Sequence, residues 1–534
     1  MRFSAKNIAA ICLIALSAMA VTVVFMPWNF NADSAFYPIL AREQLASGSL
    51  FPPGMCYSTE LFVASPSILM IPFMAFMDNW MLARSFGICV LWAIAIFFLV
   101  KTFVIRGDAH WKPALLACLL ACMPLFGSDL VDKIFLQGAY LIYYVHLTAF
   151  LIIAHYLIVN YKRLSPVRGL PRRDLISLVL MLVGMVLAIV LPNLGGIRGI
   201  LQEVLPFLLA FAVLWFIDGG TLDDLVKNKF HGLVALVWLA GIVIALVGYK
   251  VLSSLYWSTS EQMAMSMVSP HEVIDGIAAY FKDLLSLYGQ NFEAPLTSLS
   301  GIMRTLNYVY AVLMIVVFPV YSLVRIKTFK NVFARYLILF CWLSNLLMFA
   351  ISVVTGAVGI SPRYLIPTYF LNILIAVTCI EQLLEQRTPL EGRAIVVCVI
   401  AYVLLATGFF WKRALPLMRA DQTHQNIVAF LEENDLEYGY ATFFNSYVNT
   451  CYANGDVEFV SFAYSIEDEP GDPTFKWRWL TNEKWYDPSY HPGRCFILLR
   501  GDERVESKWY DLASQKLTYE DYTVLVFDKN INLY

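Results

Sequence analysis

About eleven apolar runs constrain this fold more than any other feature, because each approaches the ~20 residues that a helix needs to cross a bilayer. Lipid offers the backbone no hydrogen-bond partners, so such segments are helical. Of the 534 residues, 59% are hydrophobic and 15% are charged, against about 25% charged in soluble proteins. We therefore expect an all-α polytopic membrane domain over 1–411, and a cytosolic globular protein is excluded. The runs lie at 7–27, 80–100, 113–127, 138–160, 175–192, 199–217, 232–250, 305–324, 335–355, 364–384 and 394–411.

Basic residues predict the orientation of these spans. With the N-terminus in the cytoplasm, the inner segments hold 18 Lys and Arg, and the longer outer segments hold about eight. The first run lacks a small-x-small cleavage site, so we expect a retained span rather than a signal peptide. An odd number of spans then places the C-terminus on the extracytoplasmic side of the cell membrane or inner membrane. Lys412 and Arg413, directly after the last span, argue against this orientation.

Two outer segments are apolar without the length or composition of a span. Leu61–Met77 is short and contains Pro66 and Pro72, so we expect a re-entrant or interfacial helix. The segment 251–304 carries apolar residues at helical spacing from Ile274 to Tyr288. That period predicts an amphipathic helix, either on the membrane surface or packed between spans.

The tail, residues 412–534, differs from the rest of the chain. After Arg413 it has 10 basic and 20 acidic residues, and it is rich in Tyr and Trp. A helical stretch near 424–434 and β-rich runs at 457–463, 495–499 and 522–527 predict a small extracytoplasmic α/β domain. Its two cysteines, Cys451 and Cys495, are expected to be either buried thiols or a disulfide. Nucleic acid is not an expected partner.

Four acidic residues fall on the predicted outer side, near span ends, where a carboxylate is costly and therefore a candidate for function. Asp33 follows the first span, Glu60 precedes the proline-containing run, and Asp129 and Asp132 lie between the third and fourth spans. Such groups act as general bases or hold a divalent cation. The alternatives are a helix N-cap for Asp33 and solvated loop charges for Asp129 and Asp132.

A basic candidate lies at the outer start of the tenth span, in the sequence Ser361-Pro-Arg363-Tyr364-Leu-Ile-Pro367. Arginine here either anchors the helix at the lipid headgroups or binds phosphate through two parallel hydrogen bonds.

These features resemble the membrane-embedded C-type glycosyltransferase superfamily: the Asp33 segment, the helix behind it, the proline-interrupted run and the Arg363-Tyr364 pair. The resemblance implies transfer of a hexose or pentose from a polyprenyl phosphate carrier to a glycan, lipid or protein acceptor of the cell envelope. Asp33 matches the family's first-loop catalytic acid, and Glu60 is similar to a second acid that some members keep. Many members have an acidic pair where this chain has Asp33-Ser34, so a metal is left open, with no cofactor assigned.

The same resemblance implies that Arg363 and Tyr364 contact the carrier phosphate, with Asp129 and Asp132 nearby as further binding candidates. A phosphate leaving group needs charge stabilisation, and an incoming hydroxyl needs a base. Single displacement would invert the anomeric carbon. Two other functions fit the span pattern: a transporter or flippase of a lipid-linked or polar solute, and a non-enzymatic envelope sensor or assembly protein. Transporters often show internal repeats and charges near the middle of their spans, whereas this sequence shows no repeat and its acids lie in predicted outer loops. A sensor or assembly protein would leave Asp33 and Arg363 without a joint purpose.

Overall fold

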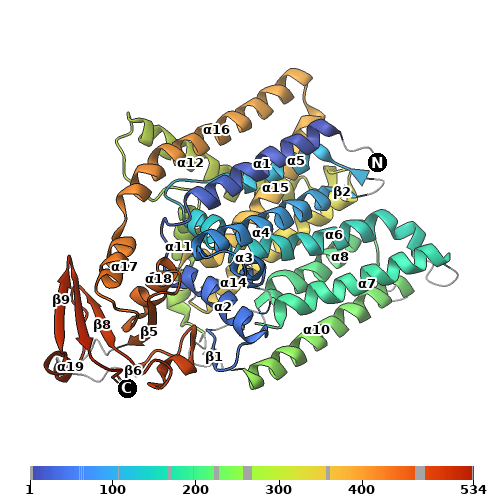
Figure 1. Ribbon diagram of the computed structural model, residues 1–534. Helices are drawn as coiled ribbons and strands as arrows, with labels where there is room; N and C mark the ends of the chain where they lie inside the picture. Colours follow the sequence, from blue (N-terminus) through green and yellow to red (C-terminus); the bar gives the residue numbers. More distant parts are fainter. Residues whose placement is uncertain are drawn as a thin grey trace. The chain divides into compact units, whose positions relative to one another are not determined.

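The structure is a computed structural model. It describes residues 4–58, 61, 63, 65–105, 108–164, 170–196, 198–221, 228–256, 267–356, 361–463, 475–531 and 533. Figure 1 shows long helices throughout and a small sheet formed by the C-terminal part of the chain. Contacts divide the chain into two compact units. Unit 1 comprises Met1–Val21, Leu91–Leu252 and Ala264–Ala414, and unit 2 comprises Thr22–Val90, Ser253–Met263 and Leu415–Tyr534.

Ten stretches of the described chain are helical, long and apolar enough to span a membrane. This confirms the expected class of integral membrane protein, with ten candidate spans in the described chain where about eleven were expected. The stretches are α1 (Ala5–Val24), α4 (Trp80–Phe103), α6 (Leu141–Leu164), α7 (Arg172–Asn193), η2 with α8 (Ile200–Val204, Leu205–Ile217), α10 (Lys229–Leu255), α12 with η3 and α13 (Leu299–Val312, Leu313–Val317, Phe318–Val324), α14 (Val332–Val354), η5 with α15 (Pro362–Leu365, Ile366–Gln386) and α16 with α17 (Pro389–Ala420, Thr423–Glu433).

Three apolar segments form shorter helices. The run expected at 113–127 is α5, Trp111–Ala121, of 11 residues, which extends about 17 Å at 1.5 Å per residue. The proline-containing run forms α3, Pro66–Met74, of nine residues. The amphipathic segment forms α11, Pro270–Ser286, which begins with a capping box. Ile274 at its start is 68% exposed whereas Tyr288, just beyond its end, is fully buried. Helix α3, with nine residues, is too short to cross a bilayer, as predicted for the proline-containing run.

Helix α15 is the centre of unit 1, with 89% of its most apolar window buried. It is apolar on nearly all sides, from Ile366 to Ile380, and such helices are stable only when other helices surround them. Tyr369 of α15 packs on Tyr288 with ring centres 4.9 Å apart, and Phe370 stacks on Tyr144 at 3.8 Å. The start of α15 is therefore fixed by aromatic contacts.

One end of unit 1 gathers loops that the charge pattern assigns to the cytoplasm. His110 Nδ1 lies 2.8 Å from Glu381 Oε1, and its Nε2 lies 3.1 Å from the Asn331 side chain. The Gln382 amide donates to Thr328 Oγ1 at 2.8 Å. Because these residues come from segments far apart in sequence, the contacts place the segments at the same end of the helix bundle.

A second set of contacts joins segments that were expected on the other side. Ser128 Oγ donates to the Leu287 carbonyl at 2.6 Å, and Val268 N donates to the Val354 carbonyl at 2.9 Å. The Asn307 amide donates to the Gly289 carbonyl at 2.6 Å. The relative sidedness of these loops therefore agrees with the charge pattern, while the identity of the cytoplasmic end stays a prediction.

Unit 2 contains a six-stranded sheet, in the order β6-β5-β4-β8-β10-β9. Strand β4 pairs in parallel with β5 and β8, and the remaining pairs are antiparallel. The strands are β4 (Tyr438–Thr442), β5 (Glu458–Ala463), β6 (Phe475–Lys476), β8 (Cys495–Arg500), β9 (Gln515–Tyr519) and β10 (Tyr522–Phe527). The smaller elements are α2 (Ala32–Ser47), β1 (Met55–Cys56), β7 (Thr481–Asn482), η6 (Glu483–Tyr486), α18 (Phe443–Tyr452) and α19 (Ser507–Leu512).

Both faces of this sheet are covered, which explains its continuous hydrophobic strands. Ile497 of β8 belongs to one buried cluster, and Phe496 and Leu498 belong to the other, because successive side chains of a strand point to opposite faces. Helix α17 covers one face and α18 the other. The expected α/β tail is confirmed.

The two tail cysteines are free and fully buried. Cys451 Sγ lies 3.5 Å from the Ala35 carbonyl, and Cys495 Sγ lies 3.6 Å from the Lys529 carbonyl. Burial raises the pKa of the Cys495 thiol to about 11, so the neutral thiol is the stable form near neutrality. Of the two alternatives, the structure has the buried thiols.

In the C-terminal part of the chain, unit 1 ends at Ala414 and unit 2 resumes at Leu415. The sequence did not indicate that Thr22–Val90 shares a unit with the tail.

We predict that a cysteine replacing exposed Glu293 reacts with a membrane-impermeant thiol reagent on intact cells, whereas one replacing exposed Arg172 reacts only after permeabilisation. The positive-inside bias gives the reason. The parent protein should carry Ser at Cys12 and Cys398, the exposed thiols of the described chain. Labelling in the reverse order would show that the topology is the opposite of the predicted one. Labelling of both positions on intact cells would show that the intervening helices do not span the membrane.

Candidate functional site

Asp33 lies in the first turn of α2, where the exposed backbone N–H groups and the helix dipole favour a negative charge. The N-cap of this helix is Asn31, whose Oδ1 accepts a hydrogen bond from Ser34 N at 3.1 Å. The alternative interpretation of Asp33 as the N-cap is therefore wrong. Asp33 is half-buried and is a residue of the helix, which begins at Ala32.

A buried arginine fixes the chain that leads into α2. Arg84, in α4, is 1% exposed, and its Nη2 donates to the Met26 carbonyl at 2.8 Å. Its guanidinium carbon also lies 4.5 Å from the centre of the Phe30 ring. A buried cation is costly unless it is hydrogen-bonded, so Arg84 holds the segment just before Asp33 in one conformation.

The C-terminal sheet domain holds α2 at its start. The Tyr452 hydroxyl of α18 donates to the Pro27 carbonyl at 3.1 Å, and the Cys451 thiol contacts the Ala35 carbonyl. Pro27 precedes Asn31 in the chain, and Ala35 follows it. The tail therefore positions the turn that carries Asp33.

The far end of α2 is held by an ion pair. Lys484 Nζ lies 2.7 Å from Glu43 Oε2, and the Asn482 amide donates to the same oxygen at 3.2 Å. Glu43 is 9% exposed, so removing its partners would leave a carboxylate out of water. Both ends of α2 thus depend on residues more than 400 positions later in the chain.

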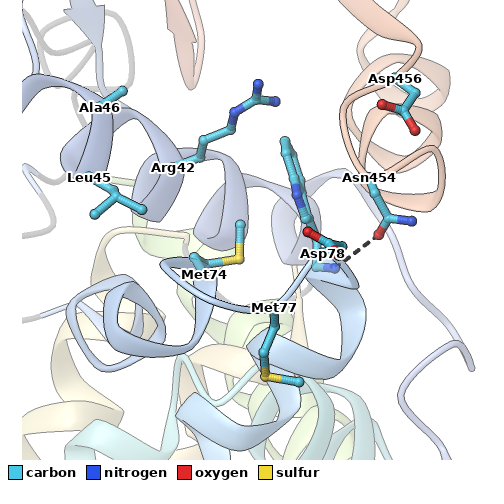
Figure 2. A pocket seen from close by; sticks show the side chains of 9 residues that line it. Arg42, Leu45, Ala46, Met74, Met77, Asp78, Asn454 and Asp456 are labelled. Carbon is cyan, nitrogen blue, oxygen red and sulfur yellow. Dashed lines mark hydrogen bonds between the residues drawn. The ribbon is translucent and has the colours of Figure 1, made fainter.

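A pocket of about 480 Å³ lies beside the second half of α2. Figure 2 shows Arg42 above Met74 and Met77, with Asn454 on the C-terminal segment. The Arg42 guanidinium lies 4.7 Å from the Trp80 ring centre, and Asn454 Oδ1 accepts from Trp80 N at 2.9 Å. The lining also includes Leu45, Ala46, Asp78 and Asp456. Asp33 is not among the lining residues. None of the lining residues was predicted from the sequence as a site residue.

The other acidic candidates lie apart from Asp33 in the chain: Asp33 belongs to unit 2, whereas Asp129 and Asp132 belong to unit 1. Glu60 lies outside the described residues. Asp132 is paired with Lys133 at 3.0 Å and accepts from the Gln137 amide at 2.9 Å. Asp129 is half-buried in the turn before η1 (Val131–Leu136). Asp132 is thus a neutralised, largely buried charge rather than a solvated one.

The described chain contains no group of three or more His, Cys, Asp or Glu arranged to hold a metal ion. Because Glu60 is not described, the Asp33 and Glu60 pair stays a prediction, as does the divalent cation.

Arg363 and Tyr364 lie in η5, directly before α15. Arg363 Nη2 donates to the Tyr364 hydroxyl at 3.4 Å, and the guanidinium carbon lies 5.3 Å from the ring centre. A second arginine, Arg198, lies 5.5 Å from the same centre. Cations stack on aromatic rings in this range, so Tyr364 orders two positive charges at one point of unit 1.

Three charged residues of interest were missed by sequence reasoning: Arg84, Arg198 and Glu203. Glu203 is 1% exposed in η2, inside an apolar run. An ionisable residue inside a spanning run indicates a functional site. This criterion would have identified Glu203. Arg84 and Arg198 lie at span ends, where arginines also anchor helices to headgroups, so nothing local distinguishes them.

No family model and no curated protein matches this chain. Among solved structures, ArnT from Cupriavidus metallidurans bound to undecaprenyl phosphate matches with a TM-score of 0.52 and 13% identity, covering 98% of each chain. The chain has the C-type glycosyltransferase fold. An oligosaccharyltransferase from Archaeoglobus fulgidus, in complex with Zn and sulfate, matches at a TM-score of 0.43 and 12% identity, over 91% of this chain and 67% of the other.

Because the match covers 98% of this chain, it includes the C-terminal sheet domain as well as the helices. Thr22–Val90 and the tail of this chain belong to one compact unit. The expectation of fold class made from the sequence is confirmed.

We predict that Gly455→Ala destabilises the protein more than Gly501→Ala. Both glycines have a positive φ, at 87° and 59°, and alanine there costs about 1 kcal/mol. At Gly455 a Cβ would lie 2.2 Å from Arg42 Nη1 and 2.8 Å from the Trp80 ring, whereas nothing lies within 4 Å at Gly501. Overpacking adds about 1–3 kcal/mol. The measurement is the apparent midpoint of thermal unfolding in detergent, and equal midpoints would refute a tight contact between α18 and α2.

Proposed function

We propose that the protein is an integral-membrane glycosyltransferase that moves a sugar from a polyprenyl phosphate carrier to an acceptor hydroxyl on the outer face. The observation that carries this proposal is the pair of ordered arginines on Tyr364, at the start of the central helix of a C-type glycosyltransferase fold. Guanidinium groups bind phosphate through parallel hydrogen bonds and stay charged at every physiological pH.

In the proposed reaction the acceptor oxygen attacks the anomeric carbon of the sugar. The bond between that carbon and the phosphate oxygen breaks, and its electrons remain on the carrier phosphate. Asp33 takes the proton of the acceptor hydroxyl as the new bond forms. A single displacement inverts the anomeric carbon, and a glycan, lipid or protein of the cell envelope is the acceptor class.

The position of Asp33 suits a general base. Its carboxylate stands in a first helical turn, and the chain before and after it is fixed by Arg84 and by the tail. A catalytic group gains rate only if it is held in a productive geometry. Arg363 and Tyr364 would hold the phosphate, Glu60 remains a second catalytic candidate, and Asp129 and Asp132 remain candidates for substrate binding.

We predict that Asp33→Asn abolishes most of the transfer while the protein stays folded. Purified protein in liposomes would be given synthetic undecaprenyl phosphate hexoses and pentoses with an envelope glycan extract, and release of undecaprenyl phosphate would be measured. Loss of a general base lowers turnover about 10²–10⁴-fold. Asp174→Asn is the matched control, because Asp174 is also an acid in a first helical turn, that of α7.

Two outcomes would count against this reading. Turnover by Asp33→Asn within about threefold of the parent is too small a loss for general-base catalysis and would remove Asp33 from that role. Intact donor moved across the bilayer by the parent protein, without cleavage of the sugar, would favour the transporter or flippase instead.

A further inference from the structure

The pocket beside the second half of α2 lies where the chain enters a candidate span. Its lining includes Trp80, the first residue of α4, and Trp80–Phe103 is long and apolar enough to cross a bilayer. The end of a span lies near the lipid headgroups, where tryptophan is enriched. All lining residues belong to unit 2, and the volume of about 480 Å³ is that of a small-ligand site. A molecule bound here would therefore lie at the membrane interface.

Apolar side chains form one part of the pocket and continue beyond it. Met74, the last residue of α3, and Met77 line it together with Leu45. Leu45 is 42% exposed, and Phe76, between the two methionines, is 74% exposed. Exposed apolar side chains beside polar ones are typical of a surface that contacts lipid. The pocket therefore offers contacts for acyl chains as well as for polar groups.

Arg42 supplies the positive charge of this pocket. Its guanidinium carbon lies 4.7 Å from the Trp80 ring centre, and no hydrogen bond or ion pair joins it to a carboxylate of the described residues. Burial raises the pKa of the nearby Glu458 carboxyl, while the Tyr490 hydroxyl and the charge of Arg42 lower it. The Tyr490 hydroxyl lies 3.1 Å from both Glu458 oxygens, so Glu458 already has a donor. Stacking on Trp80 leaves the N–H edge of Arg42 available for an anion.

Two carboxylates supply negative charge to the same pocket. Asp78 and Asp456 are exposed lining residues, and neither side chain has a hydrogen bond or ion pair within the described part of the chain. Asn454, which also lines the pocket, is fixed because its Oδ1 accepts from Trp80 N at 2.9 Å. Figure 2 shows Arg42 on one side of the pocket and Asp78 and Asp456 on the other. A ligand between them would meet positive charge at one end and negative charge at the other.

This charge pattern distinguishes between classes of ligand. Asp78 and Asp456 would repel a simple anion, and Arg42 would repel a metal cation. A carbohydrate would hydrogen-bond to all three side chains but would leave the exposed Leu45 and Phe76 without a partner. An amphiphile that carries one positive and one negative group makes charge-assisted hydrogen bonds at both ends of the pocket and covers the apolar side chains as well.

We infer that this pocket binds the headgroup of a zwitterionic phospholipid with a primary ammonium group, the chemistry of phosphatidylethanolamine. Arg42 binds the phosphate, Asp78 and Asp456 accept hydrogen bonds from the ammonium group, and the acyl chains pass over Met74 and Met77. Because the lining comes from α2, from the end of α3 and from the tail beyond α18, the bound lipid ties the tail to the membrane surface. The inference does not depend on the proposed function.

The test is native mass spectrometry of the full-length protein in detergent, with phosphatidylethanolamine, phosphatidylcholine and phosphatidylglycerol of the same acyl chains as probes. Phosphatidylethanolamine should bind about tenfold or more tighter than the other two, the factor that one hydrogen bond to a charged group contributes. Phosphatidylcholine has a cation without N–H donors, and phosphatidylglycerol has no cation. Equal affinities for the three lipids would show that the inference is wrong.

Variants assign the selectivity to this pocket. Arg42→Gln should weaken phosphatidylethanolamine binding about tenfold or more. The double variant Asp78→Asn, Asp456→Asn should bind phosphatidylethanolamine and phosphatidylglycerol within about threefold of each other, because it neither attracts the ammonium group nor repels the anion. Arg504→Gln and Asp502→Asn are matched controls, since both residues are exposed in unit 2 and neither lines the pocket. The controls should keep the parent affinities.

Two other occupants give different results. If the pocket takes a carbohydrate, an envelope oligosaccharide binds the parent, Arg42→Gln weakens that binding, and the three lipids bind alike. If it takes the polyprenyl carrier, Arg42→Gln weakens undecaprenyl phosphate binding, whereas we expect no change. Either result overturns the inference.

Unfolding midpoints separate binding from packing. A variant that only loosens the fold lowers the midpoint measured without lipid and leaves the selectivity between lipids unchanged, which would contradict the site. In the parent, phosphatidylethanolamine should raise the midpoint more than phosphatidylglycerol does, because a ligand stabilises the folded state that binds it. If Arg42→Gln does not fold, the selectivity of the double Asp variant decides.

Discussion

The structure depends on one constraint: inside a bilayer the backbone must satisfy its own hydrogen bonds, so the chain crosses as helices and polar chemistry moves to their ends. Ten candidate spans of the described chain meet this constraint. The central helix α15 is almost entirely enclosed, and the Arg363-Tyr364 pair lies in η5, directly before it. Aromatic contacts at Tyr369 and Phe370 hold this end of the helix, so the stable core and the candidate phosphate site share one element.

The same constraint explains why Asp33 depends on the tail. Cys451 and Lys484, more than 400 positions later in the chain, contact helix α2, and Tyr452 contacts the chain just before it. Most helical stability in proteins comes from tertiary packing, so contacts at Pro27, Ala35 and Glu43 position this helix. The C-terminal domain therefore positions α2 and the turn that carries Asp33.

Patterns with a fixed period were predictable from the sequence, and contacts between distant residues were not. Apolar runs located the spans, and β-rich runs located β5, β8 and β10 within the tail. The proline-containing run was recognised as too short to span. The helix start at α2 was misjudged because Asn31 and Asp33 are both good N-cap residues, and only the hydrogen bond from Ser34 separates them. Arg84 and Arg198 were missed because their partners, Met26 and Tyr364, lie far away in sequence.

We propose that a polyprenyl phosphate binds beside Arg363, directly before the central helix α15. The decisive experiment is an experimental structure of the full-length protein with bound undecaprenyl phosphate. We expect phosphate oxygens at about 2.7–2.9 Å from guanidinium nitrogens of Arg363, the distance of charge-assisted hydrogen bonds. A phosphate bound elsewhere, for example in the pocket at Arg42, with no contact to Arg363, would show that this proposal is wrong.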